Sequence, residues 1–478
     1  MNVTTAIAPG VARGDSAIAA VFERQREMAV RLRGSTAAAR IAKLRVLEAA
    51  VNARRPAIYA ALLADLRKPA AEADLSEIMP VISEIHHTVR HLKAWMRTVR
   101  VAPTMALLGT QARIRYEPKG VCLIISPWNY PINLTLGPLA CAIAAGNTAI
   151  VKPSEMTPNC SAVLAELIRE VFEPAEVAMF EGDAAVSTEL LGLPFDHMFF
   201  TGSPAVGKIV MAAAAKHLSS VTLELGGKSP VIVDATADIP KAAKSVMWGK
   251  FLNVGQTCIA PDYVYVQEKV LPAFIAQAKA AITKMYGADA QASPDYCRIV
   301  NERHFGRVKR MLDDATAHGA TVAMGGAVAE ADRFMAPTLL TNVDVNSLVM
   351  QEEIFGPLLP ILSYSDVSAP IAHINANPKP LALYVFSKDE GQIERILTET
   401  SAGGSCVNTT VLHFSHANLP FGGVNNSGIG SSHGIYGFKA FSHERAVLRE
   451  QMSATSMLAP PYTKWVKMLI GVTMKYFS

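Results

Sequence analysis

Three residue types that can act together on a carbonyl group stand far apart in the sequence: a cysteine, a glutamate and an asparagine. Cys258 follows a Gly-Gln-Thr turn in NVGQTCIAPDYVYV and precedes a Pro-Asp turn and a β-rich run. A thiolate can attack an electrophilic carbon. A lone cysteine is more often an inert buried residue, so other residues must decide which interpretation holds for Cys258.

Two glutamates stand beside glycine or proline turns. Glu224 lies inside the apolar strand pattern SVTLELGGKSPVIV, just before Gly226 and Gly227. Burial raises the pKa of an unpaired carboxyl group toward the range in which it can serve as a general base. The alternative is a Glu224 that pairs with a Lys or Arg. Glu353 precedes a Phe-Gly-Pro turn in QEEIFGPLLPI, where a surface pair of glutamates is the alternative.

The third candidate lies in LIISPWNYPINLTLGPLA, which places Trp128, Asn129 and Tyr130 between two prolines. Pro127 and Pro131 restrict the backbone and fix the direction of the Asn129 side chain. A rigidly held amide N–H can donate to a developing oxyanion. The alternative is an Asn129 that bonds the backbone of its own turn. Tyr130 fits the wall of an apolar tunnel and ordinary packing equally well.

Two strand ends could receive a nucleotide. HMFFTGSPAVGKIV combines a strand, a turn at Gly202 and a helix start, where free N–H groups suit a pyrophosphate. Gly202 and Gly207 do not give the common G-x-G-x-x-G spacing, so a plain strand-to-helix turn is equally compatible. In TAIVKPSEMTP, Lys152 and Glu155 stand just beyond a strand, where open α/β sheets bind ligands. Two surface charges are the alternative there.

The segments that must position these residues have sequence patterns typical of α/β structure. After residue 120, the β-rich runs VCLIIS, TAIVKP, VAMFEG, HMFFTG and SVTLEL alternate with helical stretches and predict a doubly wound, parallel sheet. A second α/β region runs from 229 to about 408, with helices near 237–251 and 270–286. Residues 15–98 show helical periodicity and predict amphipathic helices with solvated charges. ARIRYEPKG, 112–120, alternates like an edge strand.

Composition narrows the class of protein. The 478 residues suggest about three domain-sized units, and 50% hydrophobic with 18% charged residues indicates a globular chain. A net charge of +4 without basic runs argues against nucleic acid. The six cysteines have no metal-ligand spacing, so we expect no metal and reduced thiols in the cytoplasm. The tail WVKMLIGVTMKYFS is too short to span a bilayer; we expect it to pack on the protein itself, with weak peripheral membrane contact as the alternative.

The motifs PWNYP, KPSE, FFTGSPAVGK, LELGGKSP, GQTCIAPDY, EEIFGP and LPFGG occur in this order, and the set resembles the aldehyde dehydrogenase superfamily from about Ile18 to the C-terminus. GQTCIAPDY, FGG followed by SGIG, and the APPYTKW tail are most similar to the class 3 branch, which includes fatty, aromatic and coniferyl aldehyde dehydrogenases. One departure is Asn425, where that pattern has Gly, and it puts the local backbone in doubt.

The resemblance implies a mechanism. The Cys258 thiolate would add to an aldehyde, and the side-chain amide of Asn129 with the Cys258 backbone N–H would hold the oxyanion of the thiohemiacetal. After hydride transfer to NAD(P)+, Glu224 would activate the water that hydrolyses the thioester to a carboxylic acid. Tyr130 and Thr257 would contact the substrate, which we expect to be a medium- or long-chain aliphatic aldehyde or an aromatic one.

The resemblance also implies a cofactor site. Lys152 and Glu155 would hold the adenosine ribose, and Glu353 the nicotinamide ribose. The remaining cofactor residues would be Gly202 and Ser203 at the pyrophosphate, Trp128 near the phosphates, Gly226, and Phe355 beside the nicotinamide ring. Glu155 favours NAD over NADP because a carboxylate repels a 2′-phosphate, and Lys152 can offset that repulsion.

For the whole chain the resemblance implies six segments and a homodimer. We expect a helical part of the cofactor domain (1–111), a bridging strand (112–120), a Rossmann-like NAD(P)-binding core (121–227), a catalytic domain (228–408), a return to the cofactor domain (409–440) and an oligomerisation strand with the tail (441–478). Two other functions stay open. A CoA-acylating dehydrogenase usually lacks the Glu224 base, and a non-catalytic protein on the same scaffold would not need the complete set of catalytic residues.

Overall fold

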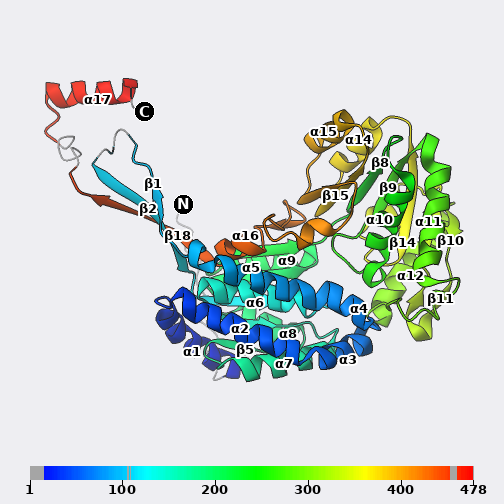
Figure 1. The fold of residues 1–478 in the computed structure, drawn as a ribbon, viewed down its shortest axis with the longest axis horizontal. Coiled ribbons are helices and arrows are strands. Elements are labelled where there is room, and N and C mark those ends of the chain that lie inside the picture. Colours follow the sequence, from blue (N-terminus) through cyan, green and yellow to red (C-terminus); the bar gives the residue numbers. More distant parts are fainter. Residues whose placement is uncertain (1–15, 105–106, 108, 453–459, 477–478) are drawn as a thin grey trace, which may run out of the picture.

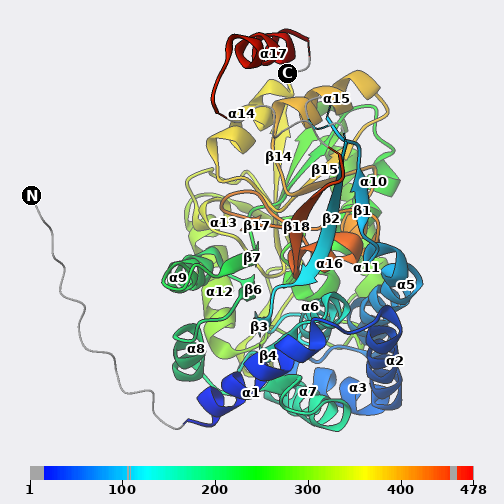
Figure 2. The ribbon, with the colours of Figure 1, turned by 90° about the vertical axis from the view of Figure 1, so that its left-hand side faces the viewer.

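The computed structural model describes residues 16–104, 107, 109–452 and 460–476. Over these residues the chain forms two α/β parts and a three-stranded arm that extends away from them (Figure 1). Figure 2 views the molecule with the arm in front of both parts. This is the mixed α/β architecture that the strand and helix patterns predict.

The first part is built on a six-stranded sheet in the order β17-β7-β6-β3-β4-β5. All its strands run parallel except β17, which pairs antiparallel with β7. The Val- and Ile-rich strands at its centre are buried on both faces, as parallel strands between helices are. The predicted alternation of strands and helices is therefore confirmed. The strands are β3 (Val121–Ile125), β4 (Thr148–Lys152), β5 (Val177–Met179), β6 (His197–Gly202), β7 (Ser220–Leu225) and β17 (Gly428–Ile429).

Helices cover this sheet, and a π-helical turn, η1, interrupts them. They are α1 (Ala17–Leu32), α2 (Ala37–Ala53), α3 (Arg55–Leu66), α4 (Ala70–Ala73), η1 (Asp74–Ile78), α5 (Met79–Trp95), α6 (Asn133–Ala145), α7 (Pro158–Val171), α8 (Ala184–Leu191), α9 (Pro204–Ala215) and α16 (Gly434–Ala440). The prediction that the charges between 15 and 98 are solvated is wrong for Lys68, Glu77 and Glu84, which are buried. Lys68 and Glu77 pair with each other, and Glu84 accepts the N–H of Gly434, so water is not needed to satisfy them.

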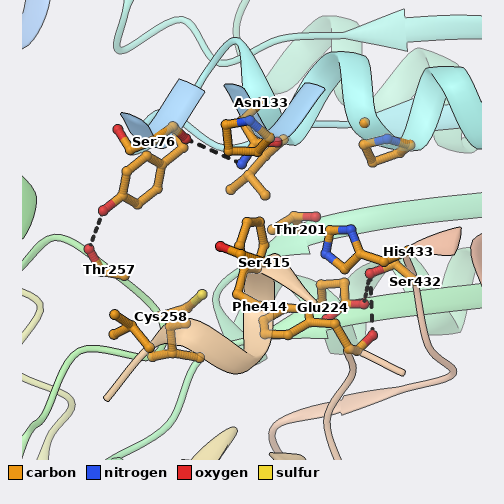
Figure 3. Close-up of a pocket in the computed structure, with 18 of the residues that line it drawn as sticks. Ser76, Asn133, Thr201, Glu224, Thr257, Cys258, Phe414, Ser415, Ser432 and His433 are labelled. Atoms are coloured by element: carbon orange, nitrogen blue, oxygen red, sulfur yellow. Dashed lines mark hydrogen bonds between the residues drawn. The ribbon is translucent and has the colours of Figure 1, made fainter. Parts of the chain in front are cut away.

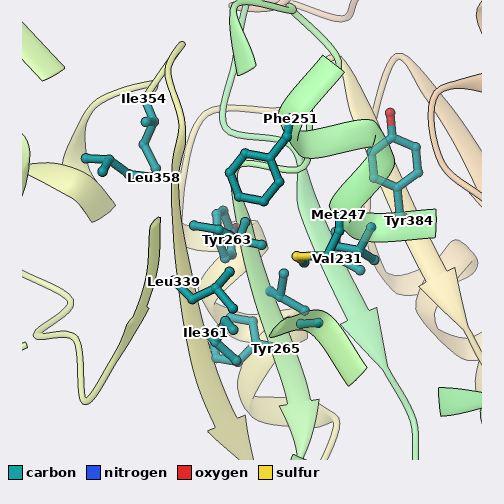
Figure 4. Close-up of a cluster of buried hydrophobic side chains, with 14 of the residues drawn as sticks. Val231, Met247, Phe251, Tyr263, Tyr265, Leu339, Ile354, Leu358, Ile361 and Tyr384 are labelled. Atoms are coloured by element: carbon teal, nitrogen blue, oxygen red, sulfur yellow. The ribbon is translucent and has the colours of Figure 1, made fainter. Parts of the chain in front are cut away.

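The second part has a seven-stranded sheet in the order β10-β13-β14-β9-β8-β15-β16, parallel except for β10. Side chains of α10 and of the strands it covers form its core (Figure 4). The predicted helices near 237–251 and 270–286 are confirmed. The strands are β8 (Pro230–Val233), β9 (Tyr263–Gln267), β10 (Thr321–Met324), β13 (Thr338–Thr341), β14 (Leu358–Tyr364), β15 (Ala382–Phe386) and β16 (Gly404–Val407), beside the hairpin β11 (Val328–Ala329) and β12 (Phe334–Met335). The helices are α10 (Ile239–Phe251), η3 (Leu252–Gly255), η4 (Glu268–Val270), α11 (Leu271–Tyr286), α12 (Glu302–Ala317), η5 (Glu330–Asp332), α13 (Leu348–Gln351), α14 (Ser368–Ala376), α15 (Glu390–Glu399) and η6 (Leu412–Ser415).

The arm consists of β1 (Val99–Val101), β2 (Thr110–Pro118) and β18 (Ser442–Glu450), in the order β1-β2-β18. The predicted strand at 112–120 and the segment near 444–450 therefore pair with each other, antiparallel, within one chain. Helix α17 (Lys464–Tyr476) lies near the far end of the arm (Figure 1). Its Trp465 and Met468 are exposed, so the expectation that the tail packs on the chain's own body is wrong for these two residues.

Candidate active site

A cavity of about 270 Å³ lies where β7, α6, η1 and the loop after η3 meet. Cys258 and Glu224 both line it (Figure 3). Tyr130 and Thr257 line it as well, and the Tyr130 hydroxyl lies 2.6 Å from the Thr257 hydroxyl. Most of the wall is apolar, and its apolar residues include Leu75, Met79, Pro80, Leu134, Phe199, Trp248, Leu252, Ile259, Phe414, Phe421 and Phe441.

Cys258 differs from the other cysteines because its side chain is only half-buried. The other five are buried: Cys122, Cys141, Cys160, Cys297 and Cys406. Burial raises the pKa of the Cys258 thiol, and the charges of Glu353 and Glu224 raise it further. The backbone N–H groups of Cys258 and Ile259 act in the opposite direction. Deprotonation of the Cys258 thiol therefore depends on these N–H donors and on any cation that binds at the site.

The loop that carries the thiol has a strained backbone. Asn253 and Val254 have φ of 51° and 56°, the left-handed region that costs a β-branched residue most. Gly255 follows with φ of 74°, and a Cβ there would lie 2.4 Å from the carbonyl oxygen of Gly356. Only glycine fits between the thiol loop and the turn that follows Glu353.

Glu224 is a buried carboxyl group with one free oxygen. Its Oε1 accepts the Ser432 hydroxyl at 2.9 Å, and its Oε2 is buried without a hydrogen-bond partner. Burial raises the pKa of Glu224 to about 8, and the Ser432 hydrogen bond lowers it. The alternative of a Glu224 paired with Lys or Arg is therefore not what the structure has.

Asn129 is 3% exposed and does not itself line the cavity, whereas its neighbour Tyr130 does. Its Nδ2 donates to the carbonyl of Gln256 at 3.0 Å, two residues before Cys258. The side chain thus bonds the thiol loop and not its own turn. Since Nδ2 carries two hydrogens, the second stays available for another acceptor.

The predicted cofactor residues do not line this cavity, and they fall into two groups. At the carboxyl ends of β4 and β6, the Lys152 ammonium lies 2.9 Å from Glu155 Oε2, and Ser203 caps α9 directly after Gly202. These two strands flank β3, so the residues share one edge of the sheet.

The second group surrounds Glu353. Oε1 of Glu353 is buried without a hydrogen-bond partner, and burial raises the pKa of this carboxyl group to about 7. A Cβ on Gly226 would lie 2.2 Å from Glu353 Oε2, so the carboxyl packs against that glycine. Phe355 stacks edge-on to Trp128, with ring centroids 5.4 Å apart. A half-buried carboxyl group with one unpaired oxygen, next to aromatic rings, fits a ligand that brings hydroxyl donors.

Several residues at the site were not singled out from the sequence. Ser432 contacts Glu224, and His433 and Asn133 line the cavity (Figure 3). Lys68 and Glu77 lie behind Asn129. The sequence offers no spacing that joins these residues, because the contacts connect segments far apart in the chain. Asn425, the departure noted above, has φ of 54°, a conformation that Asn tolerates almost as Gly does.

No group of three or more His, Cys, Asp or Glu side chains within the ranges given above could hold a metal ion. None of the helices in that part of the chain is long and apolar enough to cross a membrane.

Two α/β parts and a cavity lined by a thiol and a buried carboxyl group are typical of dinucleotide-dependent oxidoreductases that act through cysteine. The family model of the aldehyde dehydrogenase family matches residues 5–447, and the chain belongs to this family. It is an oxidoreductase that acts on aldehydes, and the family uses NAD or NADP.

Individual relatives cover nearly the whole chain. A 4,4'-diaponeurosporen-aldehyde dehydrogenase of Staphylococcus aureus is 44% identical over 88% of this chain and 91% of its own length. A dimeric, NADP-preferring aldehyde dehydrogenase of Rattus norvegicus is 44% identical over 86% of this chain and 89% of its own. The substrate-bound structure of Staphylococcus aureus AldH superposes with a TM-score of 0.92, at 41% identity, over 96% of this chain and 99% of that one.

Proposed function

We propose that Cys258 is the nucleophile, Asn129 the oxyanion donor and Glu224 the general base of an aldehyde oxidation that ends in a free carboxylic acid. The Cys258 thiol first loses its proton to solvent, and the thiolate adds to the aldehyde carbon while the free N–H of Asn129 and the Cys258 backbone N–H donate to the oxyanion. After loss of hydride, the thioester on Cys258 is attacked by water, whose proton goes to Glu224.

One observation carries this proposal: Glu224 Oε2 is buried, unpartnered and part of the same cavity wall as Cys258. A carboxyl group whose pKa is about 8 holds a proton well but exchanges it near neutral pH, which suits a base that acts once per turnover. The same residue argues against a CoA-acylating enzyme, because acyl transfer to a thiol does not need an activated water.

Two groups of residues support a dinucleotide site. The pair Lys152 and Glu155 would take the adenosine ribose, Ser203 and the start of α9 the pyrophosphate, and Glu353 the second ribose. When bound, NAD(P)+ accepts the hydride. Glu155 favours NAD, while its ion pair with Lys152 moderates the repulsion of a 2′-phosphate. The name of the NADP-preferring relative is consistent with use of both cofactors.

The substrate we propose is a long, apolar aldehyde, aliphatic or aromatic. Apolar side chains, with leucine and phenylalanine the most frequent, make up most of the cavity wall, and burial of apolar area is what such a wall can offer a ligand. One relative is named for its action on 4,4'-diaponeurosporen-aldehyde.

The test is NADH or NADPH formation by the purified protein with hexanal, decanal and benzaldehyde, with and without CoA. We expect free acid without CoA, faster turnover of decanal than of hexanal, and no turnover in Cys258→Ala. Glu224→Gln should release about one equivalent of NADH per site and then turn over at least ~100-fold more slowly, because hydrolysis loses its base. Cys406→Ala is the matched control and should stay active.

Other outcomes would contradict the proposal. A strict requirement for CoA would identify an acylating enzyme. A folded protein that binds NAD+ but oxidises none of these aldehydes would favour a non-catalytic scaffold. Full steady-state activity in Glu224→Gln would remove the base from the mechanism.

We also propose that the protein is a cytoplasmic homodimer. The apolar side chains of the arm and of α17 support a partner, and a second copy is the simplest one. Weak membrane contact through α17 is the alternative for that helix, because Lys464, Lys467 and Lys475 accompany its apolar side chains. Co-sedimentation with anionic vesicles that is lost on deletion of 460–478 would support membrane contact.

A further inference from the structure

A buried ion pair holds the loop that carries Asn129. The Lys68 ammonium and the Glu77 carboxylate are 2.7 Å apart, and both side chains are fully buried. Lys68 follows α3 and Glu77 belongs to the π-helical turn η1, so neither residue comes from the strands that carry the active site. Burial alone would lower the pKa of Lys68, but the negative charges of Glu77 and Glu72, with the Cys297 thiol, outweigh this and raise it, which keeps the ammonium charged.

Beyond Glu77, the Lys68 ammonium contacts this loop. It donates to the backbone carbonyl of Asn129 at 3.3 Å and lies 4.3 Å from the centre of the Tyr130 ring. Glu72 and Cys297 also lie near enough for their charges to act on Lys68. The ammonium therefore joins a buried cluster of charged groups to the backbone of Asn129 and to the ring beside it.

Glu77 holds the same loop two residues further on. Its Oε2 accepts the backbone N–H groups of Ile132 and Asn133, at 3.1 and 3.0 Å, where α6 begins. The pair thus contacts the chain at Asn129, Tyr130, Ile132 and Asn133. A loop fixed at these four points holds the Asn129 amide in one position, where it donates to the Gln256 carbonyl of the thiol loop.

Stability alone does not account for a buried pair, because desolvation of two charges offsets most of their attraction. We propose that Lys68 and Glu77 are positioning residues that set the direction in which the Asn129 amide donates to the oxyanion. This inference rests on the proposed role of Asn129. They touch neither substrate nor cofactor in this scheme; they act through the backbone of residues 129–133.

The test is a double-mutant cycle on kcat for decanal oxidation. Lys68→Met should lower kcat about 10–100-fold, since a displaced catalytic group loses this much, and Asn129→Ala should lower it about 100–1000-fold. In the Asn129→Ala background, Lys68→Met should cause little further loss, because no amide is left to position. Lys43→Met, which breaks the ion pair with Glu176 on the outer face of α2, is the matched control and should keep kcat.

A second variant, in which both members of the pair are neutral, separates a loss of positioning from a loss of folding. Lys68→Met combined with Glu77→Gln removes both charges and leaves a side-chain carbonyl for the N–H groups of Ile132 and Asn133. We expect this variant to unfold at a temperature close to that of the wild type, to bind NAD+ with unchanged Kd, and still to lose kcat. Unchanged kcat in it, or an equal fold-loss from Lys68→Met with and without Asn129, would overturn the positioning role. Full activity in Asn129→Ala would instead overturn the amide role in the proposed function, and the pair's role with it.

Discussion

At the scale of single residues, the chemistry that the site allows depends on which of its groups are protonated. Burial raises the pKa of Glu224 to about 8 and that of Glu353 to about 7. When they are ionised, the negative charges of these two carboxylates raise the pKa of the Cys258 thiol. Below these values the carboxyl groups are protonated, so they do not repel a thiolate but cannot act as bases. In the proposed mechanism, the proton on Glu224 therefore decides whether hydrolysis can proceed.

The first residue-scale prediction concerns Ser432. Protonated Glu224 cannot accept a proton, so base-dependent turnover should be low below pH 8 and rise through it. The Ser432 hydroxyl stabilises the carboxylate, so Ser432→Ala should move the midpoint of the pH–kcat curve upward by roughly 0.5–1 pH unit, as loss of one hydrogen bond implies. Stopped-flow kinetics of thioester hydrolysis from pH 6 to 10 would measure it. Ser431→Ala, the neighbouring serine, is the control; an unchanged or lower midpoint in Ser432→Ala would contradict the assignment.

The sequence could single out the candidate side chains but not their partners. Cys258, Glu224 and Asn129 stand out by type and by their turns and strands. Ser432 and Lys68 do not, because their contacts to Glu224 and Asn129 span 208 and 61 residues. Whether Glu224 pairs with a cation, or Asn129 with its own turn, depends on what the fold brings near, and periodicity carries no information on that.

At the scale of elements, the strands and helices around the site follow from periodicity, whereas the strained thiol loop does not. Parallel strands with continuous Val and Ile runs and helices with apolar faces form as their patterns predict. Asn253 and Val254 adopt left-handed conformations that no propensity favours. They persist because the surroundings hold them: Asn253 donates its backbone N–H to Glu72 and its side-chain amide to the Asn129 carbonyl.

The element-scale prediction concerns Gly255. Gly255→Ala should reduce the free energy of unfolding by about 2–5 kcal/mol and kcat by at least ~10-fold, because the new Cβ meets the Gly356 carbonyl and shifts the thiol loop. Gly319→Ala is the matched control, since Gly319 has φ of 89° with nothing within 4 Å of the added Cβ. Its cost should be about 1–2 kcal/mol, from the backbone alone, with kcat unchanged. Equal effects of the two substitutions in urea denaturation and in kinetics would show that the Gly356 contact is unimportant.

At the scale of the whole molecule, the cavity exists because segments from both α/β parts meet. Glu224 comes from the first sheet, Cys258 from the loop that enters the second, and Ser432 from the return of the chain to the first part. The alternation of strands and helices predicts both sheets, but the sequence alone does not indicate how they face each other. That relation rests on loops, which have no periodic signal.

The arm provides the whole-molecule prediction. A three-stranded sheet needs cover for its apolar face, yet Val99, Val101 and Leu448 are 44%, 43% and 56% exposed in the single chain. β18 also presents an edge strand of nine residues, which can pair with another chain. We therefore expect sedimentation equilibrium to give twice the mass of one chain.

Leu448→Lys should shift that equilibrium toward monomer, because a charge at the centre of an apolar contact must be desolvated without a partner, while the edge itself stays intact. Val328→Lys is the matched control: this valine is 41% exposed but belongs to β11, in the second α/β part, so its substitution should leave the mass unchanged. A wild-type protein that sediments as a monomer at micromolar concentration would contradict the dimer. A dimer that survives Leu448→Lys would move the interface away from the arm, and the exposed face of α17 would be the next surface to substitute.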